Sequence, residues 1–416
     1  MESTVYAHYT QMVEEAARQL GLQRTQYEFT QFPERELTVS IPVERDDGTV
    51  TIFRGSRVQH SSLFGPYTGG LRLHSGVDHE QIKGLAGLMT LKCALTGLPF
   101  GGACGGVTVD KSALSGAELR RLVRRYTAMV LPVIGTGVDI HSHDVGTDPE
   151  IMGWMMDTYS MMAGTAVPGI VTGKPVELSG TQGRLSATGN GAGYVLSEAM
   201  KRARISRERC TAAIVGFGKV GRAVARTLYA DGVKIIAVSD STGGIICESG
   251  IEVEALAAHK AAGGTIVGYE APGVRHVAHS EVILAPATVL ATCAVDTVMN
   301  AELAESVQCQ VVLEAGSAQL TRAADTVLAR RKIFVLPDLV ATLGGLVVSY
   351  FERVQNVQSL MWDEYEVNRM LKNIVLKAFD EVWEHSRINS LTLREGCCAI
   401  ALQRVCEAKR IRGIFP

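Results

Sequence analysis

Residues 211–240, TAAIVGFGKVGRAVARTLYADGVKIIAVSD, constrain the fold more tightly than any other stretch of this chain. An apolar run leads into G-x-G-x-x-G, an amphipathic helical pattern follows, and a second apolar run closes the unit. Gly216 allows the tight turn, Gly218 lets backbone approach a pyrophosphate, and Gly221 lets the helix pack on the strand. The stretch therefore predicts a strand, a turn, a helix and a strand, and with them a dinucleotide site.

The residues around this turn also indicate which dinucleotide would bind. The helix that opens with Lys219 and Val220 offers free N–H groups and a partial positive charge to the phosphates. Asp240 ends the second strand, 22 residues after Gly218, where an acidic group can bind both ribose hydroxyls and would repel a 2′-phosphate. We therefore predict NAD as the cofactor. NADP stays possible, because Lys219 or Arg222 could help to hold a phosphate.

Short apolar runs recur after this unit and extend the predicted sheet. They are EVILAP (281–286), VVLEAG (311–316) and KIFVLP (332–337), and helical patterns separate them. Alternating strands and helices favour a parallel sheet covered by helices. From Ser349 to the end the pattern is mostly helical. We predict an α/β fold in which this half is a doubly wound Rossmann domain.

The first half of the chain has a different pattern. Residues 38–60 alternate apolar and polar side chains about Asp46-Asp47-Gly48, which predicts a hairpin. We expect GPYTGGLRLH (65–74) to be a loop, and LPFGGACGGVTVD (98–110) to be a glycine-rich loop that runs into a strand. Helices are expected over residues 5–22, 78–95, 115–135 and 148–163. The methionines of the last of these are expected to fill the core.

The length of 416 residues is enough for two domains. The pattern changes near residue 184, where alternating strands and helices begin. We assign residues 1–183, together with 391–416 folding back, to an N-terminal α/β domain. Residues 184–390 form the predicted nucleotide-binding domain.

Composition and charge argue against several classes of protein. The net charge of −2 would not draw the chain to nucleic acid or to an anionic membrane. The N-terminus lacks the basic and apolar segments of a signal peptide, and no run of about 18 apolar residues would span a bilayer. The nine cysteines have no regular spacing, which favours reduced thiols. We expect a cytoplasmic protein with neither nucleic-acid nor membrane partners.

Colinear segments along most of the chain share the pattern of one family. They are RVQH (57–60), GPYTGGLR (65–72), GLMTLKCALTGLPFGG (87–102), DVGT (144–147), WMMDTYSM (154–161), VPGIVTGKP (167–175), GFGKVG (216–221), VSYFERVQN (348–356) and RIRGIFP (410–416). Together they resemble the glutamate/leucine/phenylalanine/valine dehydrogenases, most nearly the hexameric glutamate dehydrogenases.

This resemblance implies a fold, a reaction and partners. The fold would combine a substrate and oligomerisation domain with a Rossmann NAD(P) domain, with the active site in the cleft between them. The reaction would be reversible oxidative deamination of an amino acid to a 2-oxo acid and ammonia. The chain would act as a homo-hexamer, or as a hetero-oligomer with a catalytic glutamate dehydrogenase paralogue.

Three substrate-site residues match family positions and one does not. By resemblance, Lys92 matches the lysine that binds the α-carboxylate, Asp144 the proton-shuttling aspartate, and Ser349 the serine that contacts the distal carboxylate. Thr68, beside the Gly69-Gly70 pair, stands where the family's glycine-rich loop carries a lysine for the side-chain carboxylate. A neutral residue there no longer demands an acidic substrate side chain.

The resemblance also places residues along the cofactor. Thr188 matches a threonine near the nicotinamide amide. Two family asparagines, one near the cofactor and one near the substrate, fall at Ser317 and Thr342. Both amides are therefore absent from this chain.

The water-activating lysine of the family's GGxKGG motif is also missing, and Cys104 stands in its place. A neutral thiol, with an ordinary pKa of about 8.5, supplies no positive charge. A thiolate would place negative charge near Asp144. Loss of a general base costs about 10²–10⁴ in rate. We predict that Cys104 is mainly a replacement, and that glutamate dehydrogenase activity of this chain alone is severely impaired.

Other interpretations of Cys104 stay open at this point. His141 and His143 could join Cys104 and Asp144 in a metal site, although we assign no metal ligand. A Cys104 nucleophile activated by His143 could oxidise aldehydes with NAD. A histidine could serve as base for another substrate. Finally, Cys104 could fill space in a regulatory subunit that binds an amino-acid or nucleotide effector, since some glutamate dehydrogenases include a paralogue without the catalytic lysine.

Overall fold

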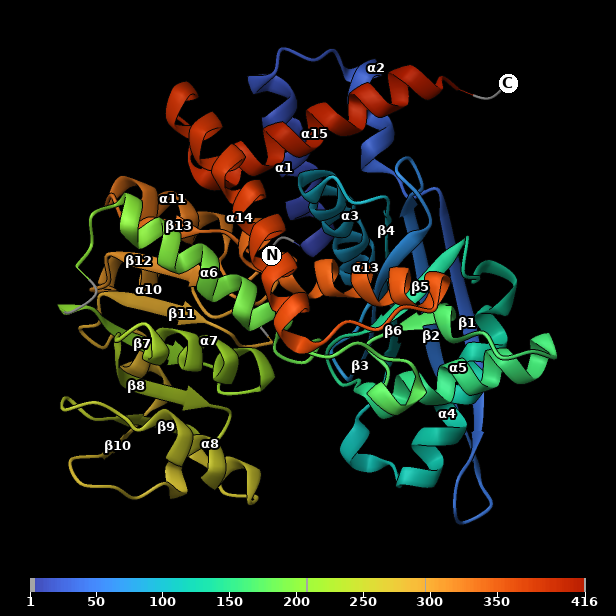
Figure 1. Cartoon of the computed structure of the whole chain (residues 1–416), viewed down its shortest axis with the longest axis horizontal. Coiled ribbons are helices and arrows are strands. Elements are labelled where there is room, and N and C mark those ends of the chain that lie inside the picture. The colour runs from blue at the N-terminus through green and yellow to red at the C-terminus, as the bar shows by residue number, and fades with distance from the viewer. Residues whose placement is uncertain (1–3, 207–208, 296, 415–416) are drawn as a thin grey trace. The chain divides into compact units, whose positions relative to one another are not determined.

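The computed structural model describes residues 4–206, 209–295 and 297–414 (Figure 1). Contacts divide the described chain into two compact units. Unit 1 contains residues 4–184, 346–367 and 398–414, and unit 2 contains residues 185–345 and 368–397. The predicted two-domain α/β fold is confirmed. The C-terminal third is divided differently from the predicted domain bounds, because residues 346–367 group with unit 1 and 391–397 with unit 2.

Unit 1 is built on a six-stranded mixed sheet in the order β1-β2-β4-β3-β5-β6. The predicted hairpin is confirmed, since β1 (Arg35–Glu44) pairs antiparallel with β2 (Val50–Ser61). The remaining strands are β3 (Tyr67–His74), β4 (Gly101–Thr108), β5 (Asp139–His143) and β6 (Val171–Thr172). β3 pairs in parallel with both β4 and β5, so the carboxyl ends of these strands lie at one edge.

Unit 1 contains the helices α1 (Val5–Gln19), α2 (Arg24–Tyr27), α3 (His79–Thr96), α4 (Gly116–Val130) and α5 (Pro149–Ala163). Among them, α3, α4 and α5 pack against this sheet, and α1 packs on α3. Ser115 and Glu118 form the capping box that starts α4, as their spacing predicts. In α5, Met152 and Met155 are buried as expected, but Met161 and Met162 are 76% and 54% exposed, so their assignment to the core was wrong.

The stretch over 65–74, expected to be a loop, contains a strand, and the strand expected within 98–110 begins earlier than predicted, at its glycines. Residues 67–74 form β3, and residues 101–108 form β4. The glycines of β4 are all buried. A Cβ at Gly102 would lie 2.2 Å from Thr90 Oγ1 of α3, and one at Gly69 would lie 1.7 Å from the carbonyl oxygen of Ala103. These glycines permit close packing inside a sheet, which their low strand propensity does not reveal.

Unit 2 carries a seven-stranded sheet in the order β10-β9-β8-β7-β11-β12-β13. Its five parallel strands are β8 (Lys234–Asp240), β7 (Thr211–Val215), β11 (Val289–Thr292), β12 (Val311–Glu314) and β13 (Phe334–Leu336). β9 (Gly243–Ile246) and β10 (Arg275–Val277) add an antiparallel edge. The predicted doubly wound sheet is confirmed, with α6 and α7 passing over it in Figure 1.

The helices of unit 2 include one that was expected to be a strand. They are α6 (Ala187–Arg202), α7 (Lys219–Ala230), α8 (Val253–Ala261), α9 (His279–Ile283), α10 (Ala301–Ser306), α11 (Arg322–Arg330) and α12 (Asp338–Ala341). EVILAP, predicted as a strand, contributes to α9, because Glu281 accepts a hydrogen bond from the backbone N–H of Ala278 and starts a helical turn. The buried strand lies a few residues later, at β11.

Three long helices complete the chain, and each contains residues of both units. They are α13 (Leu343–Gln358), α14 (Glu364–Asn389) and α15 (Leu393–Arg412). The mostly helical C-terminal pattern is therefore confirmed. Throughout the described ranges, every helix is too short or too polar to cross a lipid bilayer.

Candidate functional site

Cys104 lies in the middle of β4, on the face of the unit 1 sheet that α3 covers. It pairs with Val58 of β2, and its side chain is 2% exposed. Because side chains alternate along a strand, Cys104 shares a face with Gly102, which contacts α3. The register that pairs Thr68 with Gly102 places Thr68 on the same face. The sheet therefore brings together the two positions at which the family resemblance expects lysines.

The Cys104 thiol is held in its neutral form. Burial, reinforced by the nearby Asp144 carboxylate and opposed by Arg72 and Arg57, raises its pKa to about 12. A thiolate at neutral pH is therefore strongly disfavoured. The thiol can neither supply positive charge nor act readily as a nucleophile, which argues against the aldehyde-oxidising interpretation.

Asp144 lies over the glycine pair of β3. A Cβ at Gly70 would lie 2.5 Å from the Asp144 Cβ, so glycine at this position makes room for the carboxylate. Arg72 Nε is 3.1 Å from one Asp144 oxygen, and the Val145 N–H donates to the other at 2.7 Å. The Asp144 side chain is 32% exposed. It is thus an oriented carboxylate with access to solvent, as a proton-transfer group requires.

The two histidines before Asp144 point to the opposite face of the sheet. His141 pairs with Gly69 and His143 with Leu71, which are out of phase with Cys104. His141 is fully buried, its Nε2 lies 3.4 Å from the Tyr126 hydroxyl, and burial holds its pKa well below the usual value. The proposed His/His/Cys/Asp metal site is therefore not assembled. Likewise, His143 does not face Cys104 to activate it, and His141 is poorly placed to serve as a base there.

Thr68 and Lys92 differ in what they can offer a substrate. The Thr68 side chain is buried, and its hydroxyl donates to the Ile140 carbonyl at 3.2 Å. Lys92, on α3, is 6% exposed. Lys92 is thus a largely buried cation on the helix that covers this face, whereas the Thr68 hydroxyl is bonded to the backbone.

Arg184 is a candidate substrate-site residue that the sequence analysis missed. Its Nε donates to Ser349 Oγ at 3.1 Å, and both side chains are buried. Burial lowers the pKa of Arg184, and the carboxylates of Glu352 and Asp144 oppose that effect. Arg184 precedes the glycine-rich start of α6, a position that we had used only as a domain boundary. It places a buried cation beside Ser349.

A buried ion pair fixes the segment that leads to Arg184. Lys174 Nζ lies 2.7 Å from Glu352 Oε1, and both side chains are fully buried. The Gly173 N–H donates to the other Glu352 oxygen at 2.9 Å, and Asn356 accepts from Lys174 at 2.7 Å. These bonds join the chain after β6 to α13, the helix that carries Ser349.

In unit 2, Gly216 and Gly221 have the turn conformation and the close packing that the motif predicts, and the pyrophosphate contact of Gly218 stays a prediction. Gly216 has φ +94°, a conformation that favours glycine, and a Cβ at Gly221 would lie 1.9 Å from the Gly216 carbonyl oxygen. A Cβ at Gly218 would meet nothing within 4 Å. Gly218 is the N-cap of α7, so the N–H groups of Lys219 and Val220 lie in its first turn. The turn is shaped to accept a pyrophosphate, and its residues fit a dinucleotide.

Asp240 at the end of β8 is paired with a lysine that the sequence analysis did not single out. Lys260 Nζ lies 2.6 Å from one Asp240 oxygen, and the Thr242 N–H and hydroxyl donate to the other at 2.8 and 2.6 Å. Burial raises the Asp240 pKa, but the bonds from Lys260 and Thr242 outweigh it and lower the pKa overall. The carboxylate can still accept from a ribose, but Lys260 offsets its repulsion of a 2′-phosphate.

The other predicted cofactor contacts fall in two places. Ser317 follows β12, at the carboxyl edge where Gly216 follows β7 and Ala294 follows β11. Gly216 and Gly316 both approach the Ala294 backbone closely, so these loops converge. Thr188 lies at the start of α6, and a Cβ at Gly344 would be 3.2 Å from its Cα. Thr342, in the family's substrate-side asparagine position, donates to the Asp338 carbonyl at 2.7 Å.

Comparison with known proteins gives the same family over nearly all of the chain. Residues 33–161 match the Glu/Leu/Phe/Val dehydrogenase dimerisation domain, and residues 179–413 match the Glutamate/Leucine/Phenylalanine/Valine dehydrogenase domain. The glutamate dehydrogenase of Thermotoga maritima is 40% identical over 416 residues, covering 100% of both chains. A solved structure of hetero-hexameric glutamate dehydrogenase from Thermus thermophilus, in a leucine-bound form, has a TM-score of 0.93 at 40% identity, and the match covers 99% of this chain and 98% of that one.

Relatives with different nicotinamide cofactors are similar to this chain. An NADP-specific glutamate dehydrogenase of Synechocystis is 37% identical over 99% of this chain and 98% of its own length. An NAD-specific glutamate dehydrogenase of Clostridioides difficile is 35% identical over 97% and 96%. Both agree with the prediction of a nicotinamide dinucleotide. The chain belongs to the Glu/Leu/Phe/Val dehydrogenase family.

Proposed function

We propose that this chain is part of an NAD(P)-dependent dehydrogenase assembly that deaminates glutamate or a related amino acid, and that its own active site turns over poorly. One observation carries the proposal: Cys104, a buried thiol whose pKa is raised to about 12, stands where the family resemblance expects a cationic lysine. Loss of a general base alone costs about 10²–10⁴ in rate. Loss of the cation adds to this cost.

The remaining residues support binding of an amino-acid carboxylate. Lys92 and Arg184 are buried cations, and Ser349 is oriented by its bond to Arg184. Asp144 is held by Arg72 and can move a proton to or from the substrate nitrogen. The turn of unit 2, with Gly216, Gly218 and Gly221, would hold the nicotinamide cofactor, which would supply a hydride acceptor. Asp240 favours NAD, and Lys260 makes NADP acceptable as well.

Restoring the missing cation tests this proposal. Steady-state rates of amino-acid-dependent NAD(P)H formation would be measured for the native chain, Cys104→Lys, and the double variant with Thr68→Lys. We expect Cys104→Lys to raise the rate by about 10²-fold or more. Cys104→Ser is the matched control and should give no gain, because serine is also neutral. A native rate already typical of enzymes in general, about 10 s⁻¹ or higher, would contradict the proposal.

A second candidate function is that of a non-catalytic regulatory subunit. The same neutral Cys104 favours it, and the relative from Thermus thermophilus, a hetero-hexamer, provides a precedent for mixed assembly. Such a chain would bind a catalytic paralogue together with an amino-acid or nucleotide effector.

Co-expression with a paralogue that contains GGxKGG, followed by native mass spectrometry, distinguishes the two functions. Mixed hexamers whose activity changes with the fraction of this chain support the regulatory subunit. Homo-hexamers that turn over unaided support the enzyme. The predictions of a cytoplasmic location and of no nucleic-acid or membrane partner stay predictions.

A further inference from the structure

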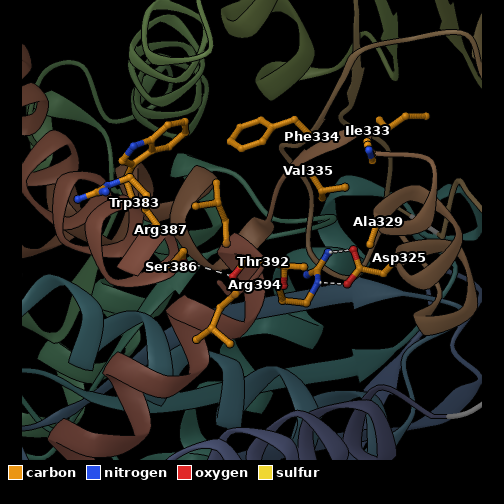
Figure 2. Close-up of a pocket in the computed structure, with 13 residues that line it drawn as sticks. Asp325, Ala329, Ile333, Phe334, Val335, Trp383, Ser386, Arg387, Thr392 and Arg394 are labelled. Carbon is orange, nitrogen blue, oxygen red and sulfur yellow. Dashed lines mark hydrogen bonds and ion pairs between the residues drawn. The ribbon is translucent and has the colours of Figure 1, made fainter. Parts of the chain in front are cut away.

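Unit 2 contains a cavity of about 340 Å³, away from the motif turn of α7 (Figure 2). It lies between α11, β13, the end of α14 and the start of α15. Most of its lining is apolar: Ala329, Ile333, Phe334, Val335, Trp383, Leu391 and Leu393. Its size and lining are those of a pocket for a small organic molecule.

Two aromatic rings form one side of this cavity. Phe334 and Trp383 have ring centroids 5.5 Å apart and planes inclined by 58°. Behind them, Phe379 packs against Trp383 at 5.7 Å, and the Arg202 guanidinium lies 5.5 Å from the Trp383 ring centroid. The rings are thereby held in place while remaining half-buried. They offer a preformed surface to an apolar or aromatic group.

The opposite side of the cavity is polar, and the positive charge of Arg394 there is paired with carboxylates. Figure 2 shows Arg394 and Asp325 facing each other there, with Nε and Oδ2 2.8 Å apart. Behind them the Arg394 guanidinium also meets Glu314, at 2.5 Å, and Asp338, at 3.5 Å. One guanidinium thus faces three carboxylates. An anionic group would therefore be repelled from this polar side of the cavity.

The cations at the rim behave differently. Lys332 and Arg387 both line the cavity and are exposed. Arg387 pairs with Glu384 of its own helix at 2.8 Å. Lys332 has no carboxylate within ion-pair distance anywhere in the described ranges. An anionic group is therefore best placed at Lys332, at the mouth of the cavity.

We propose that this cavity binds a small monocarboxylate with an aromatic or branched apolar body. The carboxylate lies at Lys332, and the body lies against Trp383 and Phe334. This site goes beyond the proposed function and does not depend on it. An occupant would also contact Leu391 and Thr392, in the turn between α14 and α15. Because both helices contain residues of the two units, this turn is suited to report occupancy to the rest of the chain.

The test is calorimetric titration of the intact, full-length assembly with 3-phenylpropanoate and, separately, with the neutral 3-phenylpropanamide. We expect the carboxylate to bind with Kd on the order of 0.1–1 mM and the amide at least about threefold more weakly. Lys332→Gln should remove that preference, and Lys332→Arg should keep it. Lys377→Gln, at an exposed lysine of α14 outside the cavity, is the matched control and should change nothing.

A second variant blocks the cavity itself. Ala329→Phe places a ring in the mouth and should weaken binding at least about tenfold. Ala323→Phe, at an exposed alanine of the same helix outside the cavity, should leave affinity unchanged. Unchanged affinity in Ala329→Phe would overturn the proposal, because the probe would then bind elsewhere, for example at Lys92. Equal binding of acid and amide, or no binding up to about 10 mM, would also overturn it.

Discussion

The candidate sites of the two units are both built around glycines, but for different reasons. In unit 2, Gly216 takes a left-handed conformation and Gly218 leaves its surroundings open. In unit 1, Gly70 and Gly102 lie in ordinary strands, and what they provide is the absence of a side chain under Asp144 and α3. The first pair serves a ligand and a turn, whereas the second serves contacts between elements far apart in the sequence.

This difference determines how far each site can be recognised from the sequence. The dinucleotide turn is formed by residues that are neighbours in the sequence, so a change at any of its three glycines is apparent in the G-x-G-x-x-G motif. In the unit 1 sheet, the packing glycines lie beside Cys104 and Thr68, two uncharged residues. The packing of the unit 1 sheet therefore does not require a charged residue at position 68 or 104.

The largest expected effect is on the packing glycines of unit 1. A Cβ in Gly102→Ala would meet the Thr90 N at 2.3 Å and the Ala86 carbonyl oxygen at 2.7 Å, backbone atoms that cannot move alone. We expect a loss of about 3 kcal/mol or more in the free energy of unfolding, measured by urea denaturation. Gly116→Ala, where a Cβ meets nothing within 4 Å, is the control. A loss below about 1 kcal/mol would mean that the close packing is not required.

The glycines of unit 2 should separate stability from binding. Gly221→Ala places a Cβ 1.9 Å from a backbone oxygen, and we expect a loss of about 2–3 kcal/mol. Gly218→Ala meets nothing within 4 Å, so stability should change by less than about 0.5 kcal/mol. Its added methyl group nevertheless stands where a pyrophosphate would approach. NADH fluorescence titration should therefore show at least tenfold weaker binding for Gly218→Ala; unchanged affinity would place the dinucleotide elsewhere.

Unit 2 should also respond to pH through Glu314. Burial, reinforced by Asp338 and Asp325 and opposed by Arg394, raises its pKa to about 7. An unfolded glutamate titrates near pH 4.3, so between these values the native chain holds more protons than the unfolded one. Stability from this group is thus complete at low pH and is lost as the pH rises toward 7, by about 1–3 kcal/mol.

Denaturation at pH 5, 6 and 7.5 would reveal this slope. Glu314→Gln cannot ionise and should flatten the curve in that window. Glu302→Gln, at an exposed position, should leave the slope as it is. If the slope persists in Glu314→Gln, the titrating group lies elsewhere.

The smallest expected effect concerns the choice of dinucleotide. Lys260→Gln removes the partner of Asp240, so the carboxylate should again repel a 2′-phosphate. We expect NADPH binding to weaken by about two- to fivefold relative to NADH, which corresponds to about 0.5–1 kcal/mol. Competitive fluorescence titration measures the ratio. If the ratio of NADPH to NADH affinity is the same in Lys260→Gln and in the native chain, the native Lys260 does not influence the choice of cofactor and stays bound to Asp240 when the cofactor is present.

The parts of this molecule that sequence predicts are those whose causes are local. The strand, turn and helix over 211–240 follow from neighbouring residues, as does the capping box of α4. Strand β3 and the glycine-rich beginning of β4 were missed because glycine's advantage there comes from Thr90 and Asp144, which are distant in sequence. The face of His141 and His143 depends on strand register, and the roles of Arg184 and Lys260 depend on partners that no spacing indicates.

The buried thiol of Cys104 can also report local opening of the unit 1 sheet. Alkylating reagents react with thiolates, and at neutral pH this thiol is both protonated and 2% exposed. Reaction with iodoacetamide therefore requires β4 to open first, and the ratio of its rate to that of a free thiol gives the free energy of that opening. The Cys104 thiol is thus a natural probe of local unfolding at the centre of the sheet.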